Sequence, residues 1–279
     1  MCTEHTAGLA AMGRRGVLVG GALAAGGLLA GPGAPAAAAA PAAGGGHRPR
    51  PGRGVLDLTH RLTTSFPTFA PGEEARRSTY VTIEDDGYYL QEWRLFEHTG
   101  THVDAPGHFT PGGRLAPDLE PAELVTPAVV VDISARASRD PDTVVTVDDV
   151  RAFERRFGRI PPGAAVIMYS GWGKRVGDPA AYRNPDAAGT LHFPGFSADA
   201  TEWLLSRRRI RSLGVDTLSI DPGNSTTFDT HLILTGADRY GLENLANVDR
   251  LPPRGATIVV GLIPLEEGSG GPARILAWR

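Results

Sequence analysis

The chain has 279 residues, of which 41% are hydrophobic and 21% are charged, so it can bury a substantial core in one large domain or two small ones. Its formal net charge of −3 gives no electrostatic reason to expect nucleic-acid binding. The single cysteine, Cys2, excludes a disulfide framework and a thiol nucleophile in the rest of the chain.

The first 46 residues have the pattern of an export signal. Arg14 and Arg15 precede an apolar run that ends at Ala30 and is followed by an Ala/Pro/Gly tract. A run of about fourteen apolar residues has signal-peptide length and is too short to span a bilayer, and paired arginines are typical of twin-arginine signals. We therefore expect export through the cytoplasmic membrane, to the cell envelope or the medium, without a stable membrane anchor. The alternative is a disordered leader that is never cleaved.

Residues 47–54 are rich in Pro, Gly and Arg, which predicts a linker. The rest of the chain alternates between strand-like and helix-like segments, without an internal repeat. Strands are predicted at 55–58, 80–83, 90–97, 128–133, 165–170, 212–217, 256–262 and 274–277. Helices are predicted at 148–157 and 198–208, with Thr146 and Ser197 as N-terminal caps, and at the short segments 230–234 and 242–246. This mixture predicts one α/β domain over 55–279, with a mixed, barrel-like sheet and flanking helices.

Between residues 98 and 108 the chain gathers side chains that bind borderline divalent metals. These are His98, His102, Asp104 and His108. All four occupy even positions, which share one face of an extended strand. A straight strand would spread residues 98 to 104 over roughly 20 Å, whereas one metal needs its donors at ~2.0–2.2 Å. We therefore expect the chain to bend within the motif, at Gly100 and Pro106.

Two later residues could complete a metal site. His231 begins a short apolar run, and Glu243 follows twelve residues later. Each alone is ordinary, since a surface histidine or a glutamate at a helix start would look the same. Together with the earlier cluster they supply enough donors for two ions, which Asp104 could bridge. Asp216 and Asp221 could orient metal-binding imidazoles, or could cap turns.

The run from His98 to Phe109, HTGTHVDAPGHF, resembles the HxGTHxDxPxH signature of the putative cyclase family, which includes bacterial kynurenine formamidases and isatin hydrolases. The resemblance continues through residues 214–222, then through His231 and Glu243 at the family's twelve-residue spacing, and ends in residues 268–274. It covers the chain from Val55 to the C-terminus.

The resemblance implies a swivelling β/β/α-type fold, a homodimer, and a metal-dependent hydrolase of amide or lactam C–N bonds in small molecules. The implied cofactor is zinc or manganese, with one or two ions per chain. By position, the ligands of the first ion are His98, His102 and Asp104, and those of the second are Asp104, His231 and Glu243. His108 matches the family's catalytic acid/base, with a role as a metal ligand as the alternative.

Residues 67–73 depart from the family pattern. The formamidases have a tryptophan that lines the substrate pocket, where this chain has Phe69. A phenyl ring can still stack on an aromatic substrate, but the assignment as a kynurenine formamidase is weakened. His192, in a Gly/Pro-rich loop, is a second candidate for substrate binding, with a purely structural role as the alternative.

These residues suggest a mechanism in which metal-activated hydroxide attacks a carbonyl carbon and His108 carries a proton to the leaving nitrogen. The sequence lacks Gly-x-Ser-x-Gly, which argues against a serine hydrolase of the α/β type. Alternatives are a lactone hydrolase or dehydratase that uses the same site, and a metal-binding protein without catalytic activity.

Overall fold

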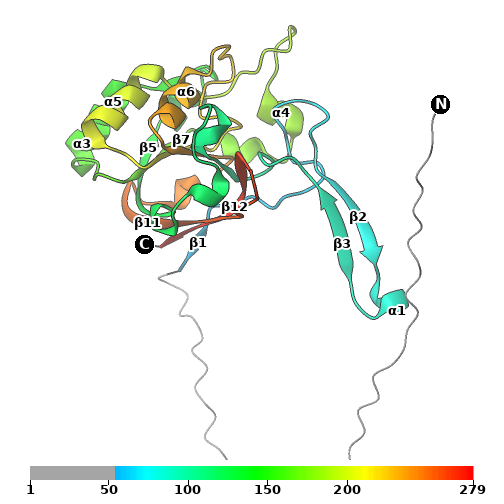
Figure 1. Ribbon diagram of the computed structural model, residues 1–279. Coiled ribbons are helices and arrows are strands. Elements are labelled where there is room, and N and C mark those ends of the chain that lie inside the picture. The colour runs from blue at the N-terminus through cyan, green and yellow to red at the C-terminus, as the bar shows by residue number, and fades with distance from the viewer. Residues whose placement is uncertain (1–53, 279) are drawn as a thin grey trace, which may run out of the picture. The chain divides into compact units, whose positions relative to one another are not determined.

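Seven strands close into a barrel, and a short eighth strand pairs with one end of a barrel strand (Figure 1). The computed structural model describes residues 54–278, so the predicted export signal lies outside the described residues. The strands are β1 (Leu56–Asp57), β4 (His102–Asp104), β5 (Val125–Asp132), β7 (Ala165–Tyr169), β9 (Ser212–Gly214), β10 (Tyr240–Glu243), β11 (Arg254–Leu262) and β12 (Gly270–Trp278). Around the barrel the order is β12, β11, β5, β7, β9, β10 and β4, and β4 pairs again with β12. The predicted mixed, barrel-like α/β domain is confirmed.

Strand direction divides the barrel into two parts. One part is a group of four strands that pair in parallel, namely β5, β7, β9 and β10. The other part consists of β4, β11 and β12, which pair only in antiparallel fashion. The parallel strands have near-continuous apolar sequences, such as Ala165–Tyr169, because both of their faces are covered. β1 pairs with the end of β12 that β4 leaves free.

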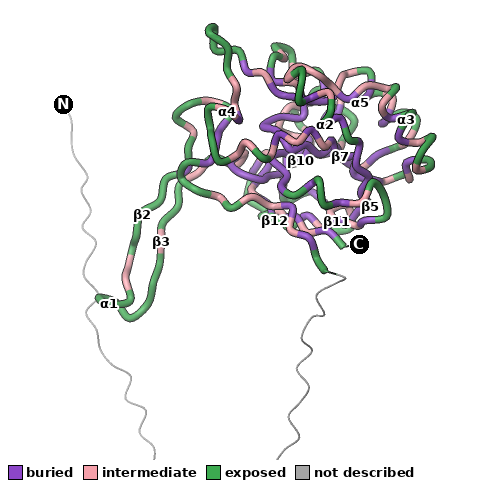
Figure 2. The backbone as a smooth tube through the Cα atoms, turned by 180° about the vertical axis from the view of Figure 1, so that it is seen from behind, coloured by how far each residue is buried: buried purple, intermediate pink, exposed green. Residues whose placement is uncertain are grey.

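Alternate side chains of the strands fill two separate layers of core. Val130, Ile167 and Leu242 belong to the layer inside the barrel. Val131 and Met168 face outward and pack against helices that cover one side of the wall (Figure 2). The main helices are α3 (Val147–Phe157), α5 (Ala198–Arg208) and α6 (Asp229–Gly236). The predicted caps are present, since the side chains of Thr146 and Ser197 accept hydrogen bonds from backbone N–H groups of the first turns of α3 and α5.

Shorter elements connect these layers. They are β2 (Arg76–Val81), α1 (Ile83–Asp86), β3 (Leu90–Arg94), η1 (Pro106–His108), η2 (Ala116–Asp118), η3 (Pro121–Glu123), α2 (Ser134–Ala137), β6 (Val144–Val145), η4 (Trp172–Arg175), α4 (Pro179–Arg183), β8 (Gly195–Phe196) and η5 (Val248–Arg250). β2 and β3 form a hairpin that extends away from the barrel (Figure 1). Residues 54–278 contain no helix that is long and apolar enough to cross a membrane.

Two of the secondary-structure elements predicted from the sequence are wrong. The strand predicted at 80–83 is displaced, because Thr82 caps α1 and the strand β2 ends at Val81. The helix predicted at 242–246 does not form: residues 242–243 end β10, which lies between β4 and β9 in the sheet, and residues 244–246 follow it without helical structure. Pairing on both edges overrides the weak helical pattern there, and Asn244 then takes a left-handed conformation with φ of 55°.

Leu242 tests how far the barrel depends on its interior packing. Its side chain is fully buried inside the barrel. We expect Leu242→Ala to lower the free energy of unfolding by about 2–5 kcal/mol, because it leaves a cavity in a close-packed core. Leu232→Ala is the matched control, since Leu232 is 49% exposed on α6 and should cost little. Chemical denaturation of both variants measures the difference, and equal stabilities would contradict this packing.

Candidate metal centre and catalytic cavity

A cavity of about 320 Å³ lies where β4 pairs with β10 and contains every residue predicted as a metal ligand. It is lined by Thr68, Phe69, Glu73, Phe96, His98, Thr99, His102, Asp104, His108, Phe109, Leu218, Ser219, Phe228, His231, Glu243 and Asn244. We call six of these side chains the donor cage: His98, His102, Asp104, His108, His231 and Glu243.

The pairing of β4 with β10 forms the centre of the donor cage. Because side chains alternate along a strand, Val103 points into the barrel while His102 and Asp104 point outward. Glu243 lies directly opposite His102, and His102 Nε2 is 3.3 Å from Glu243 Oε2 and 3.2 Å from Asp104 Oδ1. Gly241 lies opposite Asp104 and leaves room for its carboxylate, since a Cβ at Gly241 would be 2.9 Å from Asp104 Oδ2.

A left-handed turn at Gly100 brings His98 back onto this face. Gly100 has φ of 78°, which a residue with a side chain rarely adopts. His98 Nδ1 consequently lies 2.6 Å from Asp104 Oδ1, and the rings of His98 and His102 have centroids 5.2 Å apart. The bend that the sequence predicts at Gly100 is therefore present.

His231 enters the donor cage from the first turn of α6. The Asp221 carboxylate accepts hydrogen bonds from the backbone N–H groups of Thr230 and His231, at 2.8 and 3.1 Å, and lies 2.6 Å from His231 Nδ1. His231 Nε2 is then 3.3 Å from Glu243 Oε1 and 3.6 Å from Asp104 Oδ2. Asp221 thus caps the helix and orients the imidazole, which are the two roles that the sequence left open.

Hydrogen bonds behind the rings decide which ring nitrogen faces the donor cage. His102 Nδ1 donates to Gly100 O at 2.8 Å, so His102 Nε2 is the nitrogen that can bind a metal ion. Asp221 holds His231 in the same way. Among residues 54–278, His102 Nε2 and Asp104 Oδ2 are buried and have no hydrogen-bond partner. Buried polar atoms without a partner are costly, and either a proton or a metal ion in the donor cage would satisfy them.

Imidazole nitrogens and carboxylate oxygens are the donors that zinc and manganese bind in proteins. The ligand atoms of His102, Asp104 and Glu243 lie within 4.8 Å of one another, and so do those of His98, Asp104 and His108. The residues therefore fit a divalent metal ion. Asp104 belongs to both groups, as expected for a central ligand.

The electrostatics of the donor cage also favour a cation. Burial alone would lower the pKa of His102, but the carboxylates of Asp104 and Glu243 outweigh it and raise the pKa to about 10. Burial would raise the pKa of Asp104, yet His102 and the neighbouring imidazoles hold it well below its usual range. The Asp104 carboxylate thus remains charged, and this buried negative charge attracts either protons or a metal ion.

His108 differs from the other imidazoles of the cluster. It lies on η1, and its ring stacks on that of His98 with centroids 3.8 Å apart. Burial, together with the nearby His98 and His231, lowers the pKa of His108 to about 4, against the attraction of Asp104. His108 is therefore neutral near pH 7 in the metal-free site, and its ring nitrogens are available to accept a proton or to bind a metal ion.

The two predicted substrate-binding residues have different positions. Phe69 lies on the cavity wall, with its ring 6.1 Å from that of Phe228. His192 does not line the cavity, and its placement there is wrong. Its Nδ1 lies 2.8 Å from Asp142 Oδ1 and its Nε2 lies 3.6 Å from Asp186 Oδ2, so a surface ion pair holds the ring.

Sequence reasoning missed three phenyl rings of the wall, Phe96, Phe109 and Phe228. Phe109 stacks on His231 with centroids 4.4 Å apart, and Phe228 precedes α6 in a left-handed conformation with φ of 53°. Phe109 directly follows His108, so its position beside the metal motif was a usable signal. Phe96 and Phe228 lie in loops whose direction only the fold determines.

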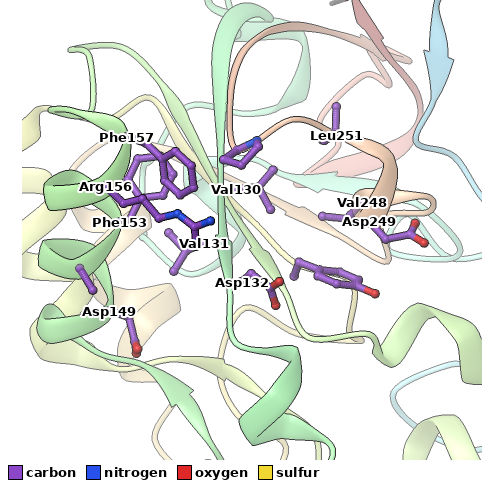
Figure 3. A pocket seen from close by; sticks show the side chains of 13 residues that line it. Val130, Val131, Asp132, Asp149, Phe153, Arg156, Phe157, Val248, Asp249 and Leu251 are labelled. Atoms are coloured by element: carbon purple, nitrogen blue, oxygen red, sulfur yellow. The ribbon is translucent and has the colours of Figure 1, made fainter.

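A larger cavity, of about 530 Å³, lies between α3 and η5 (Figure 3). Its floor is apolar, with Val130 and Val131, and Arg156 and Asp132 lie at its exposed surface. It has no histidine among its lining residues and is separate from the donor cage. The catalytic chemistry predicted from the sequence therefore belongs to the smaller cavity.

Asp221 offers a test of the donor cage without changing a ligand. Asp221→Asn keeps a good helix cap but weakens the hydrogen bond that orients His231. We expect the affinity for Zn²⁺ or Mn²⁺ to fall about 10–100-fold. Asp229→Asn, at an exposed position of the same helix, is the control. Competition with a chelator measures both, and unchanged affinity in Asp221→Asn would contradict the assignment of His231 as a ligand.

Comparison with known proteins places this site in a family. A family model described as putative cyclase matches residues 56–222. An isatin hydrolase of Roseibium aggregatum is 35% identical over 240 residues, which are 80% of this chain and 90% of the relative. A kynurenine formamidase of Geobacillus thermodenitrificans is 25% identical over 224 residues, or 78% of this chain and 94% of the relative. The solved structure of isatin hydrolase A from Ralstonia solanacearum has a TM-score of 0.76 and 39% identity, and the match covers 80% of this chain and 90% of that one. The chain therefore belongs to the putative cyclase family, whose relatives named here are hydrolases of amide bonds.

Proposed function

We propose that the protein is a metal-dependent hydrolase that opens the C–N bond of small, neutral aromatic lactams such as isatin, with aryl formamides as the next class. The observation that carries the proposal is the donor cage, which includes His108 and lies in a cavity walled by phenyl rings. A bound divalent ion would polarise the substrate carbonyl and lower the pKa of a water molecule from 15.7 to about 7.

The side chains of this chain then have distinct tasks. Asp104, with the imidazoles around it, would hold the ion and so fix where the carbonyl can lie. His108 takes a proton from the attacking water and gives it to the leaving nitrogen, so that the C–N bond breaks into a carboxylate and an amine. No serine or cysteine nucleophile is required.

The cavity wall supports a neutral aromatic substrate. Four phenyl rings and Leu218 provide apolar and stacking surface, and Glu73 is the one charged residue of the lining outside the donor cage. None of the lining residues is Arg or Lys, so a substrate with a free carboxylate, such as formylkynurenine, would have no cationic partner. A volume of about 320 Å³ is at the lower end of ligand cavities and suits a small bicyclic molecule.

His108→Ala tests the proposal together with a substrate panel of isatin, formylkynurenine, an aryl lactone and a cyclic imide. We expect isatin to have the highest kcat/KM in the presence of Zn²⁺ or Mn²⁺. His108→Ala should lower kcat about 10²–10⁴-fold while the metal content stays the same, because the proton transfer is lost and the ligands remain.

His192→Ala is the matched control and should retain full activity, since His192 lies outside the cavity. Tight metal binding without turnover of any substrate would favour a non-catalytic metal-binding protein. A clear preference for the lactone would favour a lactone hydrolase on the same site.

We also propose that the protein forms a homodimer through the arm, residues 76–94. Its strands β2 and β3 pair with no other described strand, and a lone two-stranded hairpin is marginally stable in water. The arm nevertheless exposes large apolar side chains, which are Tyr80, Ile83, Tyr88, Tyr89, Leu90 and Trp93. Such a surface requires a covering partner.

The charges of the arm support a second copy of this chain as that partner. The tip carries Glu84, Asp85 and Asp86, whereas the base carries Arg76, Arg77 and Arg94. If two arms pack antiparallel about a two-fold axis, each acidic tip meets the basic base of the other. The groove at the base of the arm shares Phe96 with the catalytic cavity, so the second copy would cover one wall of that cavity.

Reversing the charge of the tip, by Glu84→Lys, Asp85→Lys and Asp86→Lys together, should convert the dimer to a monomer, because like charges then meet. Light scattering during size-exclusion chromatography measures the mass. Mixing this variant with one that carries Arg76→Glu, Arg77→Glu and Arg94→Glu should restore a dimer. A wild-type protein that is monomeric at micromolar concentration would rule out the arm as an interface.

A further inference from the structure

His98 is held from behind by residues that the proposed mechanism does not use. Its Nδ1 faces Asp104 Oδ1 at 2.6 Å, and its Nε2 lies 3.0 Å from the Oγ of Ser269. Ser269 in turn lies 3.0 Å from Glu97 Oε2, which also accepts a hydrogen bond from Gly270 N at 3.1 Å. A series of hydrogen bonds therefore runs from Glu97 through Ser269 to the imidazole of His98 in the donor cage.

Counting hydrogens along this hydrogen-bonded series fixes which nitrogen of His98 faces Ser269 as a donor. A carboxylate can only accept, so the single hydroxyl hydrogen of Ser269 is donated to Glu97. Ser269 Oγ must then accept a hydrogen from His98 Nε2, so Nδ1 is the nitrogen left for a metal ion. Nδ1 faces Asp104 in the donor cage.

The backbone at Gly270 sets the tilt of the His98 ring. A Cβ at Gly270 would lie 2.6 Å from His98 Cε1 and 2.2 Å from Val103 O, so the imidazole packs against a bare Cα. Ser269 O accepts a hydrogen bond from Ala105 N at 2.9 Å, which ties this loop to the end of β4. The loop and the metal motif are thus one rigid unit.

We propose that Glu97 and Ser269 are a positioning pair that fixes the tautomer and tilt of His98 and so sets the metal affinity of the site. The inference rests on the proposed function, because it assigns a metal to the donor cage. Neither residue lines the catalytic cavity, so neither contacts substrate. Since His108 stacks on His98, loss of the pair also displaces the proton-transfer group and lowers kcat more than it changes KM.

Metal affinity, measured by competition with a chelator, tests the pair directly. Ser269→Ala should weaken binding of Zn²⁺ or Mn²⁺ about 10–100-fold, as expected when a group behind a metal-ligating histidine is lost. Glu97→Gln should also weaken it, because the hydroxyl is no longer aligned by a charge. In the Ser269→Ala background, Glu97→Gln should have no further effect, since its path to His98 is already broken.

Three further variants separate positioning from a general loss of structure. Ser269→Thr keeps the hydroxyl and should restore most of the affinity. Ser138→Ala and Glu266→Gln are controls at exposed positions and should bind like the wild type. The melting temperature of each metal-free variant shows whether it folds, and a loss of affinity without a loss of stability supports the pair.

Two outcomes would overturn the inference while the proposed function stands. One is a wild type that binds metal, with Ser269→Ala within about twofold of it. The other is a double variant, Ser269→Ala with Glu97→Gln, whose fold-loss in metal affinity is the product of the two single losses, because the two residues would then act independently. A wild type that binds neither metal would instead overturn the proposed function and the positioning pair with it.

Discussion

The structure of the site depends on the register of one antiparallel pair, β4 with β10. This register places His102 opposite Glu243 and Asp104 opposite Gly241, so an imidazole faces a carboxylate and the Asp104 carboxylate faces a residue without a side chain. Side chains alternate along strands, and a slip of one residue would turn all of these donors into the barrel and Val103 out of it. The interior packing of Val103 and Leu242 therefore fixes the geometry of the metal ligands on the opposite face. Fold stability and metal binding are linked through these two strands.

Three of the four imidazoles of the donor cage are each oriented by a different kind of hydrogen-bond partner. His102 uses the backbone carbonyl of Gly100, His231 uses the carboxylate of Asp221, and His98 uses the hydroxyl of Ser269. In each case the hydrogen on one ring nitrogen is engaged outside the cage, which leaves the other nitrogen free to bind. His108 instead stacks on the ring of His98. This difference fits the proton-transfer role that we propose for His108.

The sequence predicted what depends on local spacing and missed what depends on tertiary contacts. The motif from His98 to His108 was readable because alternation along a strand and a left-handed Gly100 are local properties. The helix predicted at 242–246 failed because pairing with two neighbouring strands, which no local pattern shows, decides the conformation of β10. His192 was misplaced for a similar reason, since Asp142, far away in the sequence, holds its ring outside the cavity. The approach of Ser269 to His98 likewise appears only when β12 closes the barrel against β4.

Charge balance bears on how many ions the site holds. Two carboxylates, Asp104 and Glu243, face the donor cage, and the imidazoles can bind as neutral ligands. One divalent ion neutralises both carboxylates, which compensates for burying them. A second divalent ion would leave two positive charges uncompensated in a buried site, and such a charge is costly unless an anion accompanies it. The cage alone therefore favours one ion, and a second becomes favourable only with an additional anion, such as the carboxylate that amide hydrolysis releases.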